Sequence, residues 1–68
     1  MNKQALKALT ARHGETLTDL AHVLGITENR LADKISGHNR EDFTLNDIAE
    51  TRKHYHLSAE QVELVFFQ

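Results

Sequence analysis

Apolar residues recur along the chain every three or four positions, in short segments separated by polar breaks. This spacing places the apolar side chains on one face of an α-helix, whereas a strand would need strict alternation, which no segment has. The chain has no proline, and each of its three glycines follows a periodic segment. Glycine often ends a helix because it adopts the left-handed conformation without a steric clash. The pattern therefore predicts an all-α fold of five short helices.

Polar residues suited to helix N-termini precede the periodic segments. Thr16, Thr27, Thr44 and Ser58 can each act as an N-cap. For three of them an aspartate or glutamine follows three residues later, which is the spacing of a capping box. Together with the glycine positions, these signals predict helices over residues 2–13, 17–24, 28–35, 45–55 and 59–67.

The inward faces of the five predicted helices share one small core. A chain of 68 residues forms one domain, here predicted to span residues 1–68, and buries only about 60% of its unfolded surface. The predicted core residues are Leu6, Leu9, Leu20, Leu24, Ile26, Leu31, Ile35, Phe43, Ile48, Leu57, Val62 and Phe66.

The segment from residue 17 to residue 36 has a more specific pattern. Ala21 is small where two helices would cross closely, and Gly25 stands four residues later, where a sharp turn needs positive φ. Four apolar residues are spaced to fill the angle between the two helices: Leu20, Leu24, Ile26 and Leu31. This arrangement predicts a helix-turn-helix, in which the second helix is presented outward.

The stretches that carry this pattern are "MNKQALKAL", "TLTDLAHVLGITENRLADKISG", "FTLNDI" and "LSAEQVELVFF". They resemble the lambda-repressor-like helix-turn-helix family, in particular the small Cro-like regulators of temperate phages of Gram-positive bacteria. The resemblance covers nearly the whole chain. It implies a five-helix fold, binding to double-stranded operator DNA, control of a lysis–lysogeny switch in the bacterial cytoplasm, and often a homodimer.

Three positions depart from the pattern of that family. Leu17 stands where a glutamine usually contacts DNA, and Thr10 stands where an arginine often pairs with an acid. Lys34 occupies a place that is commonly apolar, so Ile35 is expected to make the buried contact instead.

In the geometry of the family, the third helix enters the major groove with its N-terminal residues toward the base edges. Asn29 suits an adenine edge, Arg30 a guanine, and Glu28 or Asp33 the amino group of a cytosine. Helix N-termini attract phosphate, and the loop after the third helix adds polar side chains. The predicted DNA-binding residues are Thr16, Thr27, Glu28, Asn29, Arg30, Asp33, Lys34, Ser36, His38, Asn39 and Arg40.

The charge of the chain leaves a second interpretation open. The net charge is −2, with a balance of +2 over residues 1–40 and −4 over residues 41–68. The third helix is neutral, since Glu28 and Asp33 oppose Arg30 and Lys34. Glu28 also suits the helix dipole, and Asp33 can pair with Arg30, so neither acid needs DNA to explain it. The alternative function is therefore an antirepressor that binds a partner phage repressor.

The last helix has more apolar residues than the core needs. Leu64 and Phe67 point away from the face shared by Val62, Val65 and Phe66. We therefore expect Leu64 and Phe67 to form a protein interface, with a partner protein or with a second copy of the chain.

Other function classes find little support in the sequence. With no cysteine, no glycine-rich phosphate loop and little room for a buried pocket, we expect no enzyme, no cofactor and no small-molecule substrate. His54 and His56 form a His-x-His pair, but no further cluster completes a metal site. The longest apolar run, "LVFF", is too short for a membrane span, and the charged first residues do not resemble a signal peptide.

Overall fold

Five α-helices and one 3₁₀ turn make up the protein in the computed structural model, which describes all residues from 1 to 68. The elements are α1 (Lys3–Arg12), α2 (Leu17–Leu24), α3 (Glu28–Ser36), η1 (His38–Arg40), α4 (Leu45–Tyr55) and α5 (Ala59–Phe66). There is no strand, so the predicted all-α class is confirmed, and every predicted helix end lies within one residue of the observed end. The radius of gyration, 10.8 Å, matches the roughly 11 Å of a compact chain of this length.

The helix starts are fixed by side chains that bind the free backbone N–H groups of the first turn. Thr16, Thr44 and Ser58 form complete capping boxes with Asp19, Asp47 and Gln61. The Thr27 hydroxyl accepts a hydrogen bond from the amide of Arg30, and Asn2 caps α1 in the same way. These local bonds explain why the predicted boundaries were accurate.

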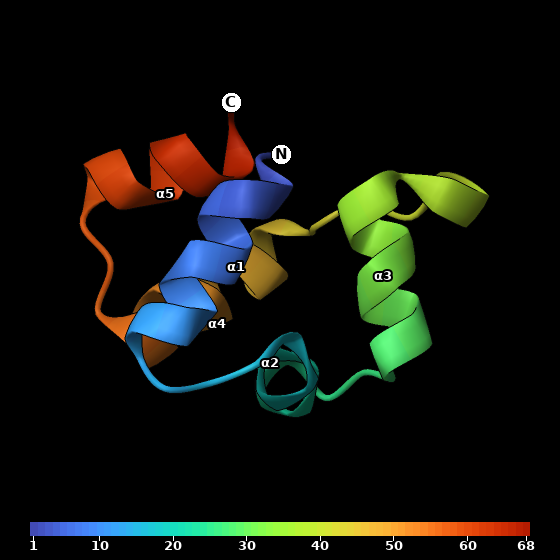
Figure 1. Ribbon diagram of the computed structural model, residues 1–68. Helices are drawn as coiled ribbons and strands as arrows, with labels where there is room; N and C mark the ends of the chain where they lie inside the picture. Colours follow the sequence, from blue (N-terminus) through green and yellow to red (C-terminus); the bar gives the residue numbers. More distant parts are fainter.

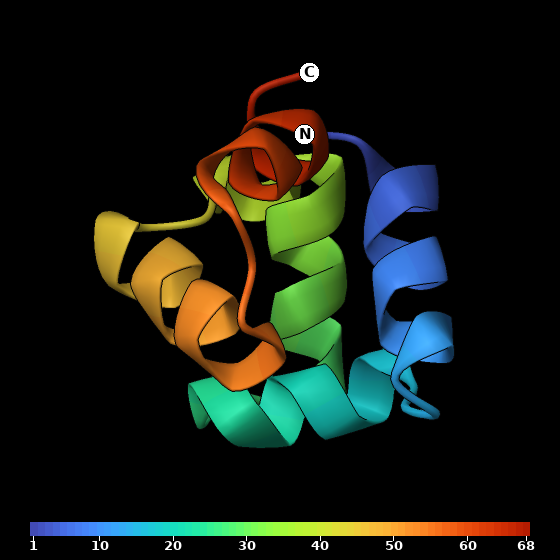
Figure 2. The same cartoon turned by 90° about the vertical axis from the view of Figure 1, so that its left-hand side faces the viewer.

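The helices pack around a common core (Figures 1 and 2). In Figure 2, α1 and α4 lie on opposite sides, α5 lies above them and α2 runs across the bottom. The remaining side is covered by α3, which stands apart from α1, α4 and α5 in Figure 1. Both termini lie beside α5, where the amide of Asn2 donates to the carbonyl of Val65 at 2.8 Å. No helix combines the length and the apolar character needed to cross a membrane.

The buried core has nine apolar residues, fewer than the sequence predicted, and polar residues are buried as well. Six predicted core residues are fully buried: Leu6, Leu9, Leu20, Leu31, Leu57 and Phe66. The other six are only partly buried and pack against that cluster: Leu24, Ile26, Ile35, Phe43, Ile48 and Val62. Ala21, Tyr55 and Val65 complete the buried cluster. Tyr55 was missed because it stands in the polar stretch "RKHYH".

Two buried threonines are satisfied by their own helices. The Thr10 hydroxyl donates to the carbonyl of Lys7, and the Thr51 hydroxyl donates to the carbonyl of Asp47. Thr10, which replaces the arginine expected from the resemblance, therefore needs no charged partner. No buried side-chain nitrogen or oxygen lacks a hydrogen-bond partner.

Candidate functional site

Gly25 sets the direction of α3 relative to α2. It ends α2 with φ of 69° and ψ of 31°, and its amide donates to the carbonyl of His22. The next amide, of Ile26, returns to the carbonyl of Ala21 at 3.0 Å. These two bonds close the last turn of α2, and the chain then enters α3, which runs crosswise to α2 (Figures 1 and 2).

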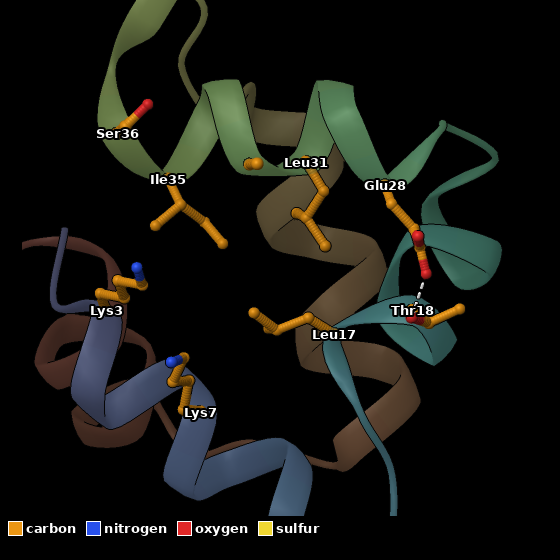
Figure 3. Close-up of a pocket in the computed structure, with 9 residues that line it drawn as sticks. Lys3, Lys7, Leu17, Thr18, Glu28, Leu31, Ile35 and Ser36 are labelled. Carbon is orange, nitrogen blue, oxygen red and sulfur yellow. Dashed lines mark hydrogen bonds between the residues drawn. The ribbon is translucent and has the colours of Figure 1, made fainter.

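The first turn of α3 is open to solvent. Glu28, Asn29 and Arg30 are all exposed, as the sequence predicted for the N-terminal end of this helix. The Glu28 carboxylate accepts a hydrogen bond from the hydroxyl of Thr18 on α2 (Figure 3). Glu28 thus lies at the favourable end of the helix dipole and is also held toward α2.

Arg30 pairs with Glu41, which follows α3 in the chain, and not with an acid of α3 itself. Its Nε lies 3.2 Å from Oε1 of Glu41, and the two side chains are 57% and 22% exposed. The pair of Arg30 with Asp33 that the sequence allows is not formed, and Asp33 instead accepts from Nδ2 of Asn39 at 3.2 Å. An ion pair this exposed contributes only about 0.2–1 kcal/mol, so Arg30 can exchange Glu41 for another anion at little cost.

Lys34 is not part of the exposed surface. Its side chain is 4% exposed, and Nζ donates to Oδ2 of Asp47 at 2.8 Å and to the carbonyl of Asp42 at 3.0 Å. The ammonium of Lys34, which was predicted to contact DNA, is thus enclosed between α3 and α4 and does not face solvent. Ile35, expected to replace it in the core, is only partly buried.

The environment of Asp47 explains how a lysine can occupy this place. Burial alone raises the pKa of the Asp47 carboxyl, but the hydrogen bond from Lys34 and the amide of Thr44 outweigh it. The resulting pKa lies below the ordinary value, so Asp47 is ionised and Lys34 keeps a charged partner. The same carboxylate also completes the capping box of α4.

The loop after α3 turns through a left-handed segment that the sequence analysis did not anticipate. Gly37, Asn39 and Arg40 have φ of 76°, 55° and 59°. The Ser36 hydroxyl accepts from the amide of His38 at 3.3 Å, which fixes the start of η1. Asn39 tolerates this conformation better than most residues, so "GHNR" carried a weak signal for such a turn. His38, Asn39 and Arg40 are all exposed, and Arg40 forms no ion pair.

The two threonines expected near phosphate are already engaged. The amide of Thr16 donates to Oδ2 of Asp19 at 2.8 Å, and the Thr27 hydroxyl accepts from the amide of Arg30. An anion at the start of α2 or α3 would therefore have to bind other backbone amides of the first turn, because the Thr16 amide and the Thr27 hydroxyl already have partners.

The pairings leave the face of α3 with an acidic character. Arg30 and Lys34 both have carboxylate partners, whereas Glu28 and Asp33 have only uncharged partners. The unpaired cations near this face are Arg40 of η1 and two lysines of α1, Lys3 and Lys7, which line a groove beside α3 (Figure 3). Sequence reasoning missed the two lysines because their nearness to α3 depends on how α1 packs.

The histidine pair does not act as a unit. Nε2 of His54 lies 3.1 Å from Oε1 of Glu15, an atom that also accepts from the Tyr55 hydroxyl at 2.8 Å. Burial and this hydrogen bond raise the pKa of Tyr55 above its ordinary value. His56 instead ends α4 in the left-handed conformation. No group of three or more His, Cys, Asp or Glu side chains is placed to hold a metal ion.

Large apolar side chains are exposed at three places. Leu64 and Phe67 are 49% and 59% exposed, in agreement with their predicted outward direction. Leu45, which the sequence analysis did not single out, is 84% exposed at the start of α4.

Comparison with known proteins adds no relative: no family model, no curated protein and no solved structure matches the chain. The function is therefore argued from the arrangement of its own residues.

Proposed function

We propose that the chain is a helix-turn-helix regulator of the lambda-repressor-like, Cro-like kind, which binds double-stranded operator DNA through α3. The observation that carries this proposal is the exposed first turn of α3, held crosswise to α2 by the turn at Gly25 (Figure 1). A helix presented in this way fits the width of the major groove.

The residues of that turn suit the edges of bases. Asn29 can bind an adenine, and Arg30 can bind a guanine once it leaves Glu41, which costs little because the pair is exposed. Glu28 and Asp33 suit the amino group of a cytosine. The first-turn amides of α2 and α3, with His38 and Arg40 of the loop, would hold phosphates. A dimer would bind half-sites about 10 base pairs apart.

The test is a fluorescence-anisotropy titration of the protein against DNA from its own regulatory region, at low salt. Arg30→Ala should weaken binding about tenfold and relax the preference at one base position. Lys53→Ala, which removes an exposed cation from α4, is the matched control and should change affinity little. Absence of binding at micromolar protein concentrations contradicts the proposal.

Salt provides a second readout of the same proposal. Since Lys34 is enclosed and Arg30 is assigned to a base, Arg40 is the arginine left for the backbone, and few phosphates would be neutralised. The slope of log affinity against log salt should therefore be shallow, at about −0.9 for each phosphate contacted.

The acidic character of α3 favours one further candidate, an antirepressor that covers the DNA-binding face of a partner phage repressor. Glu28 and Asp33 have no cationic partner in the chain and would be attracted to a basic surface. The double variant Glu28→Gln/Asp33→Asn separates the two functions. It should weaken co-purification with a candidate repressor if the protein is an antirepressor. It should strengthen non-specific binding to DNA if the acids only repel phosphate.

A further inference from the structure

A groove of about 410 Å³ lies between α1, the start of α2 and α3 (Figure 3). Its apolar lining comes from Leu17 of α2 and from Leu31, Ala32 and Ile35 of α3. Leu17 and Ile35 are partly buried, so each leaves part of its apolar surface facing the groove. A hollow of this size lies within the range of small-molecule sites, about 300–1,000 Å³.

One end of the groove is cationic. Lys3 and Lys7 stand four residues apart on α1 and therefore share a face of that helix. Figure 3 shows both side chains on the α1 side of the opening. Neither lysine forms an ion pair within the chain, so both ammonium groups are free to bind an anion.

The other end has the opposite charge. Glu28 lines the groove at the side where α3 meets α2, and the hydroxyl of Thr18 holds its carboxylate there (Figure 3). A ligand with an anionic group at each end would bring one of them close to Glu28. The groove is thus suited to a molecule with an apolar body and a single anionic head.

We propose that this groove binds a small amphipathic monoanion, with its apolar body against Leu17, Ala32 and Ile35 and its carboxylate-type head between Lys3 and Lys7. The proposal concerns a ligand rather than a substrate and uses an open surface groove rather than a buried pocket. It does not depend on whether α3 binds DNA.

Octanoate is a suitable probe, because it combines an apolar chain with one carboxylate. Titrated into ¹⁵N-labelled protein, it should shift the amide signals of Lys7, Leu17, Ala32 and Ser36 with a Kd of about a millimolar. Suberate has the same chain length with a second carboxylate, and acetate lacks the apolar chain. Both should bind at least about tenfold more weakly. The neutral analogue 1-octanol should also bind more weakly than octanoate.

The variant Lys3→Gln/Lys7→Gln should weaken octanoate binding by about five- to tenfold, since each exposed ion pair contributes modestly. Lys53→Gln, which removes one cation from α4, is the control and should bind octanoate as the wild type does. Both lysines of the groove are exposed, so the double variant should keep the wild-type spectrum away from α1.

Three results would overturn the proposal. The first is that octanoate shifts no signal around the groove. The second is that suberate or 1-octanol binds as well as octanoate. The third is that the double lysine variant keeps the wild-type affinity.

Discussion

Lys34 and Asp47 meet inside the protein at 2.8 Å, and the lysine also donates to the carbonyl of Asp42. Removing two charges from water costs several kcal/mol, which a close ion pair with further hydrogen bonds can offset. Here the amide of Thr44 donates to the same carboxylate oxygen of Asp47 at 2.9 Å, and the Thr44 hydroxyl accepts from the amide of Asp47. The stability of the region between α3 and α4 therefore depends on both residues being present.

Removing one partner of this pair should be costly. Lys34→Met keeps a long side chain but leaves the Asp47 carboxylate enclosed without a cation, so we expect a loss of about 3 kcal/mol in the free energy of unfolding. Urea unfolding followed by circular dichroism measures this loss. The double variant Lys34→Met/Asp47→Asn should recover most of it, and a double variant as unstable as the single one would contradict the explanation.

The same pair predicts a pH dependence. Because the folded pKa of Asp47 lies below its value of 3.8 in the unfolded chain, its stabilising contribution is present above that pH. The contribution is lost as the pH falls through the folded pKa. Wild-type stability should therefore decline in this acidic range more steeply than that of Asp47→Asn, measured by urea unfolding from pH 6 to pH 2. Parallel curves for the two proteins would show that Asp47 does not titrate as described.

At the level of helices, the turn between α2 and α3 depends on Gly25 for a conformational reason alone. Its φ is 69°, and a Cβ atom added there would meet no other atom within 4 Å. The space is available, so the cost of a side chain is the strain of the left-handed conformation. The direction of α3 is thus set by backbone preference rather than by packing at the glycine.

Gly25→Ala should lower the free energy of unfolding by about 1 kcal/mol, because alanine resists the left-handed conformation. Gly25→Asn is the matched control and should cost less, since asparagine tolerates that conformation. Thermal unfolding by calorimetry compares the three proteins. If asparagine were as costly as alanine, the cost would have to come from contacts rather than from the backbone.

The helices were predictable because their signals are local. Each capping box involves residues only three apart, and the left-handed stop at Gly25 directly follows the last residue of α2. Partners across elements were not predictable in this way. Arg30 and Glu41 are 11 residues apart, and Lys34 and Asp47 are 13 apart. Their pairing depends on how α3 packs against the segments that follow it.

The same distinction between local signals and contacts across elements applies to the candidate DNA-binding surface. The outward position of Glu28, Asn29 and Arg30 was expected from the family resemblance, and all three side chains are exposed. The burial of Lys34 and the position of Lys3 and Lys7 beside α3 depend on the packing of whole helices. Lys34 follows Leu31 by three residues and shares its face, but the buried contact was expected from Ile35, because no local signal marks Asp47 as the partner of the lysine.

Across the whole molecule, the apolar surface left uncovered gathers around α5. Leu64 and Phe67 are exposed there, and a hollow of about 140 Å³ beside Leu64 is lined by Ala5 and Ala8 of α1. Leu45 is even more exposed, but it lies alone at the start of α4. We therefore predict that a homodimer forms through this side and covers Leu64 and Phe67.

Leu64→Ser/Phe67→Ser should therefore shift any self-association toward the monomer, as measured by sedimentation equilibrium over a range of protein concentrations. Each large apolar side chain removed from an interface weakens association by roughly tenfold or more. Leu45→Ser should leave the association unchanged. An equal effect of Leu45→Ser, or a wild type that stays monomeric at millimolar concentration, contradicts this assignment of the interface.

The contact between Lys34 and Asp47 also constrains how the sequence can diverge. A change at either position alone leaves a charge without its partner, so in related chains substitutions at the two sites should be correlated. Divergence is easier if the acid is lost first, because the ammonium would still hold the carbonyl of Asp42. Descendants with an apolar residue at position 34 should then have passed through an intermediate that had already lost the carboxylate at position 47.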